Sequence, residues 1–177
     1  MIMEVDRESM EYDIVIVGAG PSGLATAIKI KQLNPETNVC ILEKGSEVGA
    51  HILSGNVFET RALDELIPDW RDKDTPIKTK VKKEKFLFLS KKNSLSWPTW
   101  LLPSVQQNHN NYIISLANLC RWLAVEAENL GVEIFPGFAA SKVLYSEDDQ
   151  IIGVQTGDMG VDKEGNKKDS FEPGINI

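Results

Sequence analysis

The chain has 177 residues, of which 42% are apolar and 25% are charged, and its net charge is −7. This composition is typical of a soluble globular protein with a core and excludes the disordered and fibrous classes. The negative charge argues against a nucleic-acid partner, and no apolar run approaches the roughly 20 residues that span a bilayer.

The histidines and cysteines predict no metal site. Cys40 and Cys120 lie in apolar segments far apart in the sequence, which gives neither a pair of metal ligands nor a disulfide framework. Neither His51 nor His109 has metal-ligand spacing. We therefore expect two buried free thiols.

The N-terminal third predicts a βαβ unit. Residues 1–11 form an acidic leader, unlike a signal or transit peptide. Tyr12–Val17 is β-branched and apolar on both faces, which predicts a central strand of a parallel sheet. Pro21–Leu33 predicts a helix that stops at Asn34, and Val39–Glu43 predicts a second strand. Such a unit is right-handed and parallel.

The middle of the chain predicts short elements joined by loops. Lys44–Gly55 is rich in glycine and serine and predicts an extended loop. Thr60–Leu66 predicts a short helix, and Lys85–Leu89 predicts a strand. The basic run Lys78–Lys85 predicts solvated surface. Ser94–Pro103 is aromatic and broken by prolines, so it cannot form a long helix.

The C-terminal third begins with the clearest helical pattern. Ser115–Leu130 repeats apolar residues at i, i+3, i+4 and i+7 and is followed by glycine. Val132–Phe135 and Ser141–Tyr145 predict strands, and Gln150–Gln155 is expected to pair with the latter. From Gly157 onward the apolar content is low, and no regular element is predicted.

The glycine turn between the first strand and the first helix predicts a dinucleotide site. Gly18, Gly20 and Gly23 have the spacing G-x-G-x-x-G, which allows a tight turn, close approach of a pyrophosphate and close helix packing. Glu43, at the end of the second strand, is placed to accept hydrogen bonds from ribose hydroxyls. A carboxylate there disfavours the 2′-phosphate of NADP. These residues alone leave NAD and FAD open.

Two long stretches resemble the electron transfer flavoprotein-ubiquinone oxidoreductases. They are residues 41–70, ILEKGSEVGAHILSGNVFETRALDELIPDW, and the stretch from Leu102 to Gly174. The loop Gly49–Gly55 and the stretch Pro136–Gly160 are specific to that family. The resemblance implies an α/β, Rossmann-like FAD-binding domain with inserted β elements over residues 12–177. That domain would be incomplete, lacking its C-terminal return strand.

The resemblance also implies an activity. The family contains FAD and a 4Fe-4S cluster, accepts electrons from reduced electron transfer flavoprotein and passes them to ubiquinone in the respiratory chain. It implies a peripheral position on the cytoplasmic face of a bacterial inner membrane, or on the mitochondrial inner membrane in eukaryotic relatives. The cluster ligands and later domains are expected outside this chain, since a cluster needs four thiolates. The fragment alone is expected to be inactive.

The cofactor-binding residues that the resemblance implies form a turn and a loop. They are Gly18, Gly20, Pro21, Ser22 and Gly23 at the pyrophosphate, Glu43 at the ribose, and Lys44, Gly49, Ala50, His51, Ser54 and Gly55 toward the flavin. Many related flavoproteins place an arginine where this chain has Ser115, so Arg121 is the nearest candidate. His51 either binds the cofactor or stabilises the loop. No catalytic acid or base is expected, because the flavin carries the electrons.

An aromatic loop predicts a membrane and quinone side within residues 94–103. Trp97, Trp100, Leu101 and Leu102 follow Lys91-Lys92, a combination that suits a membrane interface. The alternative is a loop folded onto its own core, and the lipid-soluble acceptor of the family favours the membrane.

Two other functions remain open from the sequence. One is a different flavin-dependent reductase or monooxygenase of this fold class that uses NAD(P)H. The other is a non-catalytic FAD-binding fragment.

Overall fold

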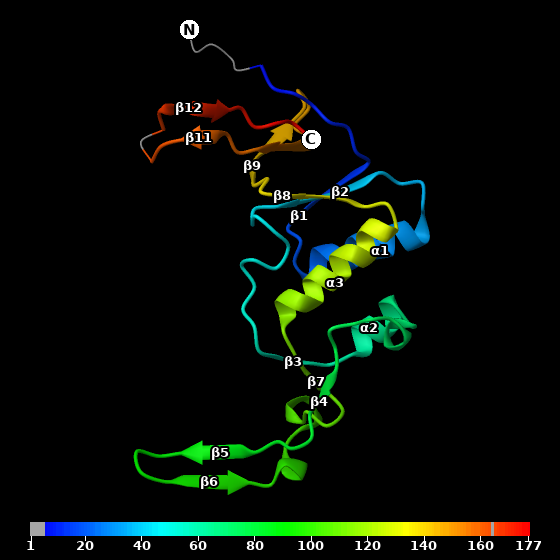
Figure 1. Ribbon diagram of the computed structural model, residues 1–177, viewed down its shortest axis with the longest axis vertical. Helices are drawn as coiled ribbons and strands as arrows, with labels where there is room; N and C mark the ends of the chain where they lie inside the picture. The colour runs from blue at the N-terminus through cyan, green and yellow to red at the C-terminus, as the bar shows by residue number, and fades with distance from the viewer. Residues whose placement is uncertain (1–5, 164) are drawn as a thin grey trace. The chain divides into compact units, whose positions relative to one another are not determined.

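The computed structural model describes residues 6–163 and 165–177, which form two compact units. The first unit consists of the chain up to Ile52 together with Cys120–Ile177. The second unit consists of Leu53–Leu119. Each unit has its own sheets (Figure 1).

A three-stranded parallel sheet organises the first unit, in the order β1-β2-β8 (Figure 1). Its strands are β1 (Ile14–Val17), β2 (Val39–Glu43) and β8 (Glu133–Pro136). Helix α1 (Pro21–Leu33) connects β1 to β2, which confirms the predicted βαβ unit. The Rossmann-like α/β fold class is therefore confirmed.

The strand β1 does not take the central place that its apolar residues predict. Among the described strands it pairs only with β2, and Val17 at its end is 60% exposed. The strand β2 lies between β1 and β8 and is buried along its first four residues. Within the described residues β1 therefore lies at the edge of its sheet, and the central position that its apolar residues predict is not observed there.

Helix α1 and helix α3 (Leu116–Asn129) confirm the two predicted helices. Helix α1 begins with Pro21, whose fixed φ suits a first helical position. Its buried face consists of Leu24, Ala27, Ile28 and Lys31, and that of α3 consists of Ala117, Leu119, Cys120, Leu123, Ala124 and Ala127. The Lys31 ammonium donates to the carbonyl oxygens of Pro35 and Thr37. These hydrogen bonds hold the turn that follows α1 against the helix. Burial of a cation is thus offset by hydrogen bonds.

Antiparallel strands complete the first unit. The predicted hairpin is confirmed by β9 (Ala140–Tyr145) and β10 (Ile151–Thr156). A second pair, β11 (Met159–Val161) and β12 (Lys167–Glu172), was not predicted. Strand β12 is exposed along five of its six residues, so it lacks the apolar face on which a sequence pattern depends.

The segment Gly174–Ile177 lies beside β10. The Ile177 carbonyl accepts from Val154 N at 2.7 Å, and Ile177 N donates to the Val154 carbonyl at 2.8 Å. On the other side, Asn176 N donates to the Glu8 carbonyl at 2.9 Å. Ile177 is buried with Cys40 and Leu42 of the parallel sheet. This short segment therefore connects the β9–β10 hairpin to the core.

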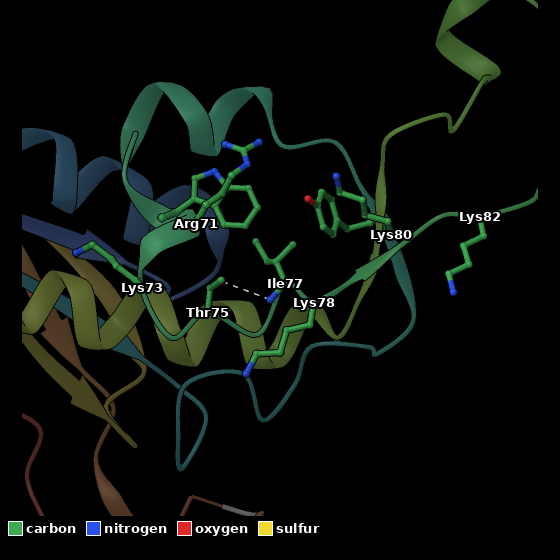
Figure 2. A pocket seen from close by; sticks show the side chains of 9 residues that line it. Arg71, Lys73, Thr75, Ile77, Lys78, Lys80 and Lys82 are labelled. Carbon is green, nitrogen blue, oxygen red and sulfur yellow. Dashed lines mark hydrogen bonds between the residues drawn. The ribbon is translucent and has the colours of Figure 1, made fainter.

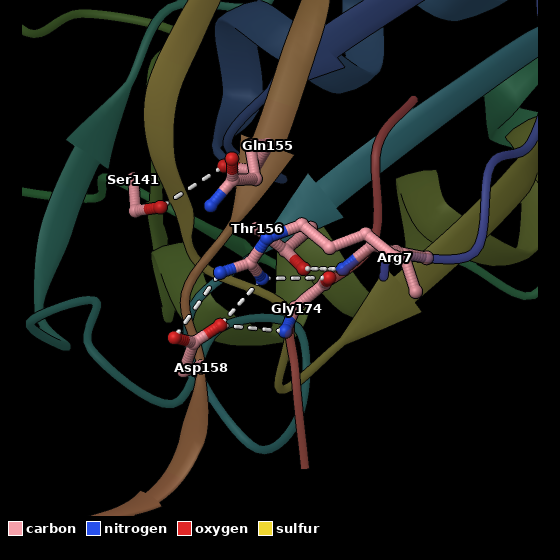
Figure 3. A network of polar contacts seen from close by, with 7 residues as sticks. Arg7, Ser141, Gln155, Thr156, Asp158 and Gly174 are labelled. Carbon is pink, nitrogen blue, oxygen red and sulfur yellow. Dashed lines mark hydrogen bonds and ion pairs between the residues drawn. The ribbon is translucent and has the colours of Figure 1, made fainter. Parts of the chain in front are cut away.

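A charged network holds this segment in place (Figure 3). The Arg7 guanidinium donates to both carboxylate oxygens of Asp158, at 2.5 and 3.2 Å, and to the Gly174 carbonyl at 2.9 Å. Asp158 also accepts from Gly174 N at 2.8 Å. The hydrogen bonds from Arg7 and then Gly174 hold the pKa of Asp158 below its usual range.

The second unit contains a small antiparallel sheet, a hairpin and a short helix. The sheet has the order β3-β7-β4. The strands are β3 (Asn56–Phe58), β4 (Thr79–Lys80), β5 (Phe86–Leu89), β6 (Ser94–Trp97) and β7 (Tyr112–Ile114), with α2 (Arg61–Leu66) and 3-10 turns at Trp70–Asp72, Thr99–Leu101 and Ser104–Gln106. The helix at 60–66 and the strand at 85–89 are thereby confirmed. The stretch 94–103 is a strand followed by a short turn, as its prolines require.

We predict that Asp158→Asn lowers the free energy of unfolding at pH 7. Because the folded state depresses the pKa of Asp158, its contribution is present above the unfolded pKa of about 3.9 and is lost as the pH falls through the folded value. Urea denaturation from pH 7 to pH 3 should show the difference between parent and variant shrinking below about pH 4. Asp148→Asn, in an exposed turn, is the charge-matched control. A difference independent of pH would contradict the prediction.

Candidate cofactor-binding site

The turn after β1 has a backbone that glycine makes possible. Gly18 has φ +102°, a conformation that side chains rarely adopt. Its N–H donates to the Leu42 carbonyl at 2.7 Å, which ties the turn to β2. The first glycine therefore serves the tight turn that the motif predicts.

The other two glycines have different surroundings. A Cβ on Gly23 would lie 2.1 Å from the Gly18 carbonyl oxygen and 3.2 Å from Ile16 Cγ2, so no side chain fits there. A Cβ on Gly20 would meet no heavy atom within 4 Å. Gly23 is thus required by close packing of α1, whereas Gly20 leaves open space that a ligand could occupy.

The start of α1 can hold an anion. Gly20 is its N-cap and provides no side-chain hydrogen bond, and the first turn contains no acidic residue. The first N–H groups of a helix have no partner within the helix and carry partial positive charge. Ser22 and Gly23 contribute such N–H groups, whereas Pro21 has none. A pyrophosphate fits this position by charge and by the space beside Gly20.

Glu43 connects the glycine turn to the loop that follows β2. Its Oε2 accepts from Ala19 N at 2.9 Å, and its Oε1 accepts from Gly45 N at 2.7 Å. Each carboxylate oxygen can accept a second hydrogen bond, so the half-buried group retains capacity for ribose hydroxyls. The sequence predicted the proximity of Glu43 to the turn but not the contribution of Ala19, which acts through its backbone alone.

The loop after Glu43 is held by short turns and one ion pair. Gly49 is buried with φ +85°, and Ile52 N donates to its carbonyl at 3.2 Å. Arg121 Nη2 lies 2.9 Å from Glu47 Oε1. The structure therefore joins Arg121 to the loop through Glu47. No sequence pattern connects residues 74 positions apart, so the role of Glu47 could not be predicted.

The remaining predicted loop residues are more loosely placed. Lys44, Ala50 and His51 are exposed, and within the described residues none is hydrogen bonded to the glycine turn. Ser54 and Gly55 belong to the second unit and are exposed. Gly55 has φ +85°, a backbone conformation that residues other than glycine rarely adopt.

The predicted membrane-side residues lie on and after the β5–β6 hairpin. Trp97, Trp100 and Leu101 are 42%, 75% and 51% exposed, whereas Leu102 is half-buried. The hairpin strands add exposed apolar side chains that were not among the predicted membrane-side residues: Phe86, Leu87, Phe88, Leu89 and Leu95. Ring contacts join Phe88 to Phe86 and to Trp97, with centroids 5.3 and 6.1 Å apart. No described helix has the length and apolar character needed to cross a bilayer.

The two cysteines are the buried free thiols that the sequence predicts. Burial raises the pKa of both Cys40 and Cys120 to about 11. Both therefore remain protonated at neutral pH.

The chain is similar in sequence to several known proteins. A model of the Thi4 family matches residues 2–67. The mitochondrial electron transfer flavoprotein-ubiquinone oxidoreductase of Oryza sativa subsp. japonica is 55% identical over 175 residues, which cover 97% of the chain. The chain resembles the N-terminal region of this oxidoreductase family throughout.

Other relatives agree with this assignment. The probable electron transfer flavoprotein-ubiquinone oxidoreductase of Acinetobacter baylyi is 50% identical over 182 residues, which cover 99% of the chain. The chain spans 30% and 32% of the lengths of the rice and Acinetobacter proteins. The predicted resemblance is therefore confirmed for a region that corresponds to about a third of these oxidoreductases.

Solved structures show the same fold. A geranylgeranyl bacteriochlorophyll reductase-like protein from Thermoplasma acidophilum superposes with a TM-score of 0.62 at 19% identity, covering 96% of this chain and 37% of that one. A myxobacterial chondrochloren halogenase, a variant of FAD-dependent halogenases, gives 0.54 at 16% identity, covering 88% and 34%. At these identities the likeness concerns the fold alone.

We predict that Gly20→Val abolishes FAD binding in the full-length protein without unfolding it, because its side chain would fill the space beside the helix start. Gly23→Val is the matched variant, and we expect it to unfold the region, since its Cβ would overlap the Gly18 carbonyl. Flavin absorbance per protein and far-UV circular dichroism distinguish the two outcomes. Full FAD content in Gly20→Val would contradict the assignment of this site.

Proposed function

We propose that this chain is the FAD-binding N-terminal part of an oxidoreductase that accepts electrons from reduced electron transfer flavoprotein and reduces ubiquinone. The observation that carries the proposal is the open space beside Gly20, bordered by the uncapped start of α1 and connected to Glu43. The sequence similarity to the oxidoreductase family supports the choice of electron donor and acceptor.

The residues of the site bind and orient the cofactor. When bound, FAD supplies the redox chemistry that accepts and donates electrons. The N–H groups of Ser22 and Gly23 hold its pyrophosphate, and Glu43 accepts hydrogen bonds from the ribose. The loop toward the flavin contains Gly49, Ala50 and His51, and Lys44 precedes it in the sequence. The Arg121–Glu47 ion pair positions that loop rather than the phosphates.

We propose that the 4Fe-4S cluster and the quinone pocket belong to parts of the protein outside these residues. A cluster takes four thiolates, whereas this chain has two cysteines, both buried and protonated at neutral pH. The chain would therefore contribute the first part of a longer domain, residues 12–177, to the complete enzyme.

The hairpin supports a peripheral position at a membrane. Exposed apolar side chains lie on both faces of the hairpin, with Phe86, Phe88, Leu95 and Trp97 on one face and Leu87 and Leu89 on the other. Tryptophan is favoured at the depth of lipid headgroups. We propose that the β5–β6 hairpin and residues 99–102 lie in one leaflet of the membrane that holds the quinone. In bacteria this would be the cytoplasmic face of the inner membrane.

The activity is tested with the full-length protein. We expect a flavin absorption spectrum and quinone-dependent oxidation of reduced electron transfer flavoprotein. Rapid reduction of the flavin by NADPH would instead identify a reductase or monooxygenase. A colourless full-length protein would contradict the proposed function.

The membrane contact gives a separate prediction. Leu89 and Leu95 are 77% and 65% exposed, and burial of a leucine side chain contributes about 1.5–3 kcal/mol. Leu89→Ser and Leu95→Ser should each weaken binding of the full-length protein to phosphatidylcholine vesicles by about tenfold or more. Leu33→Ser, at a 75% exposed position of α1, is the control and should leave vesicle binding unchanged. Equal binding by all three variants would exclude the hairpin from the membrane contact.

A further inference from the structure

The charge of the chain is segregated along the sequence. The whole chain carries −7, yet residues 53–119, the second unit, contain ten basic and seven acidic residues. Between Lys78 and Lys92 seven lysines stand against one acidic residue, Glu84. This stretch also contains β5 and the turn of the exposed hairpin. Positive charge and exposed apolar surface therefore occur in the same segment.

A basic cleft of about 580 Å³ lies at the start of this segment (Figure 2). Its apolar lining comes from Trp70, Ile77 and Tyr112, which are 1%, 4% and 8% exposed. The two aromatic rings pack edge to face with centroids 5.9 Å apart. The cationic residues of the lining are Arg71, Lys73, Lys78, Lys80 and Lys82. The cleft therefore has a buried aromatic floor, and cationic side chains surround it.

Three of these cations have carboxylate partners. Arg71 lies 2.6 Å from Asp64, Lys73 3.9 Å from Asp69, and Lys78 3.0 Å from Asp74. The Arg71 and Lys78 side chains are nevertheless 52% and 71% exposed, so solvent screens both pairs.

The positive charge is not cancelled further along the segment. Within the described residues Lys80 and Lys82 make no ion pair, and Lys80 Nζ lies 5.7 Å from the Tyr112 ring centroid. Glu84 is the one acidic residue of this run and offsets one of its seven lysines, and its Oε2 accepts from Asn108 N at 2.9 Å. The lysines that lead into the hairpin therefore keep an excess of positive charge.

The lysine side chains of the cleft are spread out, so they suit a surface that presents a layer of many anions better than a single enclosed anion. In Figure 2 the ammonium groups of Lys73, Lys78 and Lys82 point in different directions along the extended segment instead of converging. The phosphates of a lipid surface form such a layer, and each lysine near an anionic leaflet contributes about 1 kcal/mol. Lys91 and Lys92 place two more cations at the turn of the same hairpin.

We propose that this lysine surface, consisting of Lys78, Lys80 and Lys82 with Lys91 and Lys92 at the hairpin turn, binds the phosphate groups of anionic phospholipids. The inference rests on the proposed membrane contact of the hairpin. The hairpin inserts its apolar side chains, and the lysines that precede it in the sequence or lie at its turn select a negatively charged leaflet. The sequence alone indicated only solvated surface for this run, because the neighbouring aromatic cleft and exposed hairpin are not visible in a pattern of charges.

The test measures binding of the full-length protein to vesicles of pure phosphatidylcholine and of phosphatidylcholine with 30 mol% phosphatidylglycerol, a composition of about one anionic lipid in three. The parent should bind the anionic vesicles more tightly, and the preference should fall as salt is added. The triple variant Lys78→Gln, Lys80→Gln, Lys82→Gln should lose about 100-fold in affinity for the anionic vesicles only. A control with the same change of charge, Lys29→Gln, Lys142→Gln, Lys168→Gln, should retain the preference.

The outcomes separate this inference from the proposed function. Equal, salt-independent binding of the parent to both kinds of vesicle would contradict anionic-lipid binding by the lysine surface. It would not contradict the membrane contact of the hairpin. Failure of the parent to bind either vesicle would overturn both. A triple variant that keeps its lipid preference but loses affinity for electron transfer flavoprotein would assign the surface to an acidic protein partner and contradict the proposal. Flavin absorbance and circular dichroism equal to the parent confirm that the variant is folded.

Discussion

The close approach of α1 to the glycine turn is the constraint on which the first unit depends. With a Cβ position 2.1 Å from the Gly18 carbonyl, residue 23 has room for a hydrogen atom only. This contact fixes where the helix begins relative to β1. The helix start in turn sets where its first N–H groups point, so the position of a bound phosphate follows from packing. The same turn leaves the neighbouring Gly20 in open space.

Glu43 adds a second connection at this point. By accepting from Ala19 and Gly45, one carboxylate joins the turn after β1 to the loop after β2. Shortening this side chain would leave two backbone donors, Ala19 N and Gly45 N, without their acceptor, which costs more than the loss of a surface hydrogen bond. The acid of the dinucleotide motif therefore organises the backbone here, and its two oxygens retain capacity for further hydrogen bonds. The Arg121–Glu47 pair extends the same organisation further along the loop.

Elements that bury an apolar face could be predicted from the sequence, and these make up much of the fold. The βαβ unit, α3, α2 and the β9–β10 hairpin all follow from periodicity and from glycine and proline signals. Two kinds of strand were missed. The strands β3, β4 and β7 have only two or three residues each, too few to show an alternating pattern. The strands β6, β11 and β12 lack a buried apolar face. The edge position of β1 and the Glu47–Arg121 contact depend on residues distant in sequence, which no local pattern encodes. The proximity of Glu43 to the glycine turn could be predicted because both lie within thirty residues of each other in the sequence.

The burial of the two thiols has a consequence for handling and for oxidative damage. With a pKa of about 11, roughly one thiol in ten thousand is ionised at pH 7. The thiolate is the form that alkylating reagents and peroxides attack. Cys40 in β2 and Cys120 in α3 are 0% exposed as well, so access is blocked in addition to ionisation. Both thiols are therefore poor targets for alkylating reagents and peroxides while the chain remains folded.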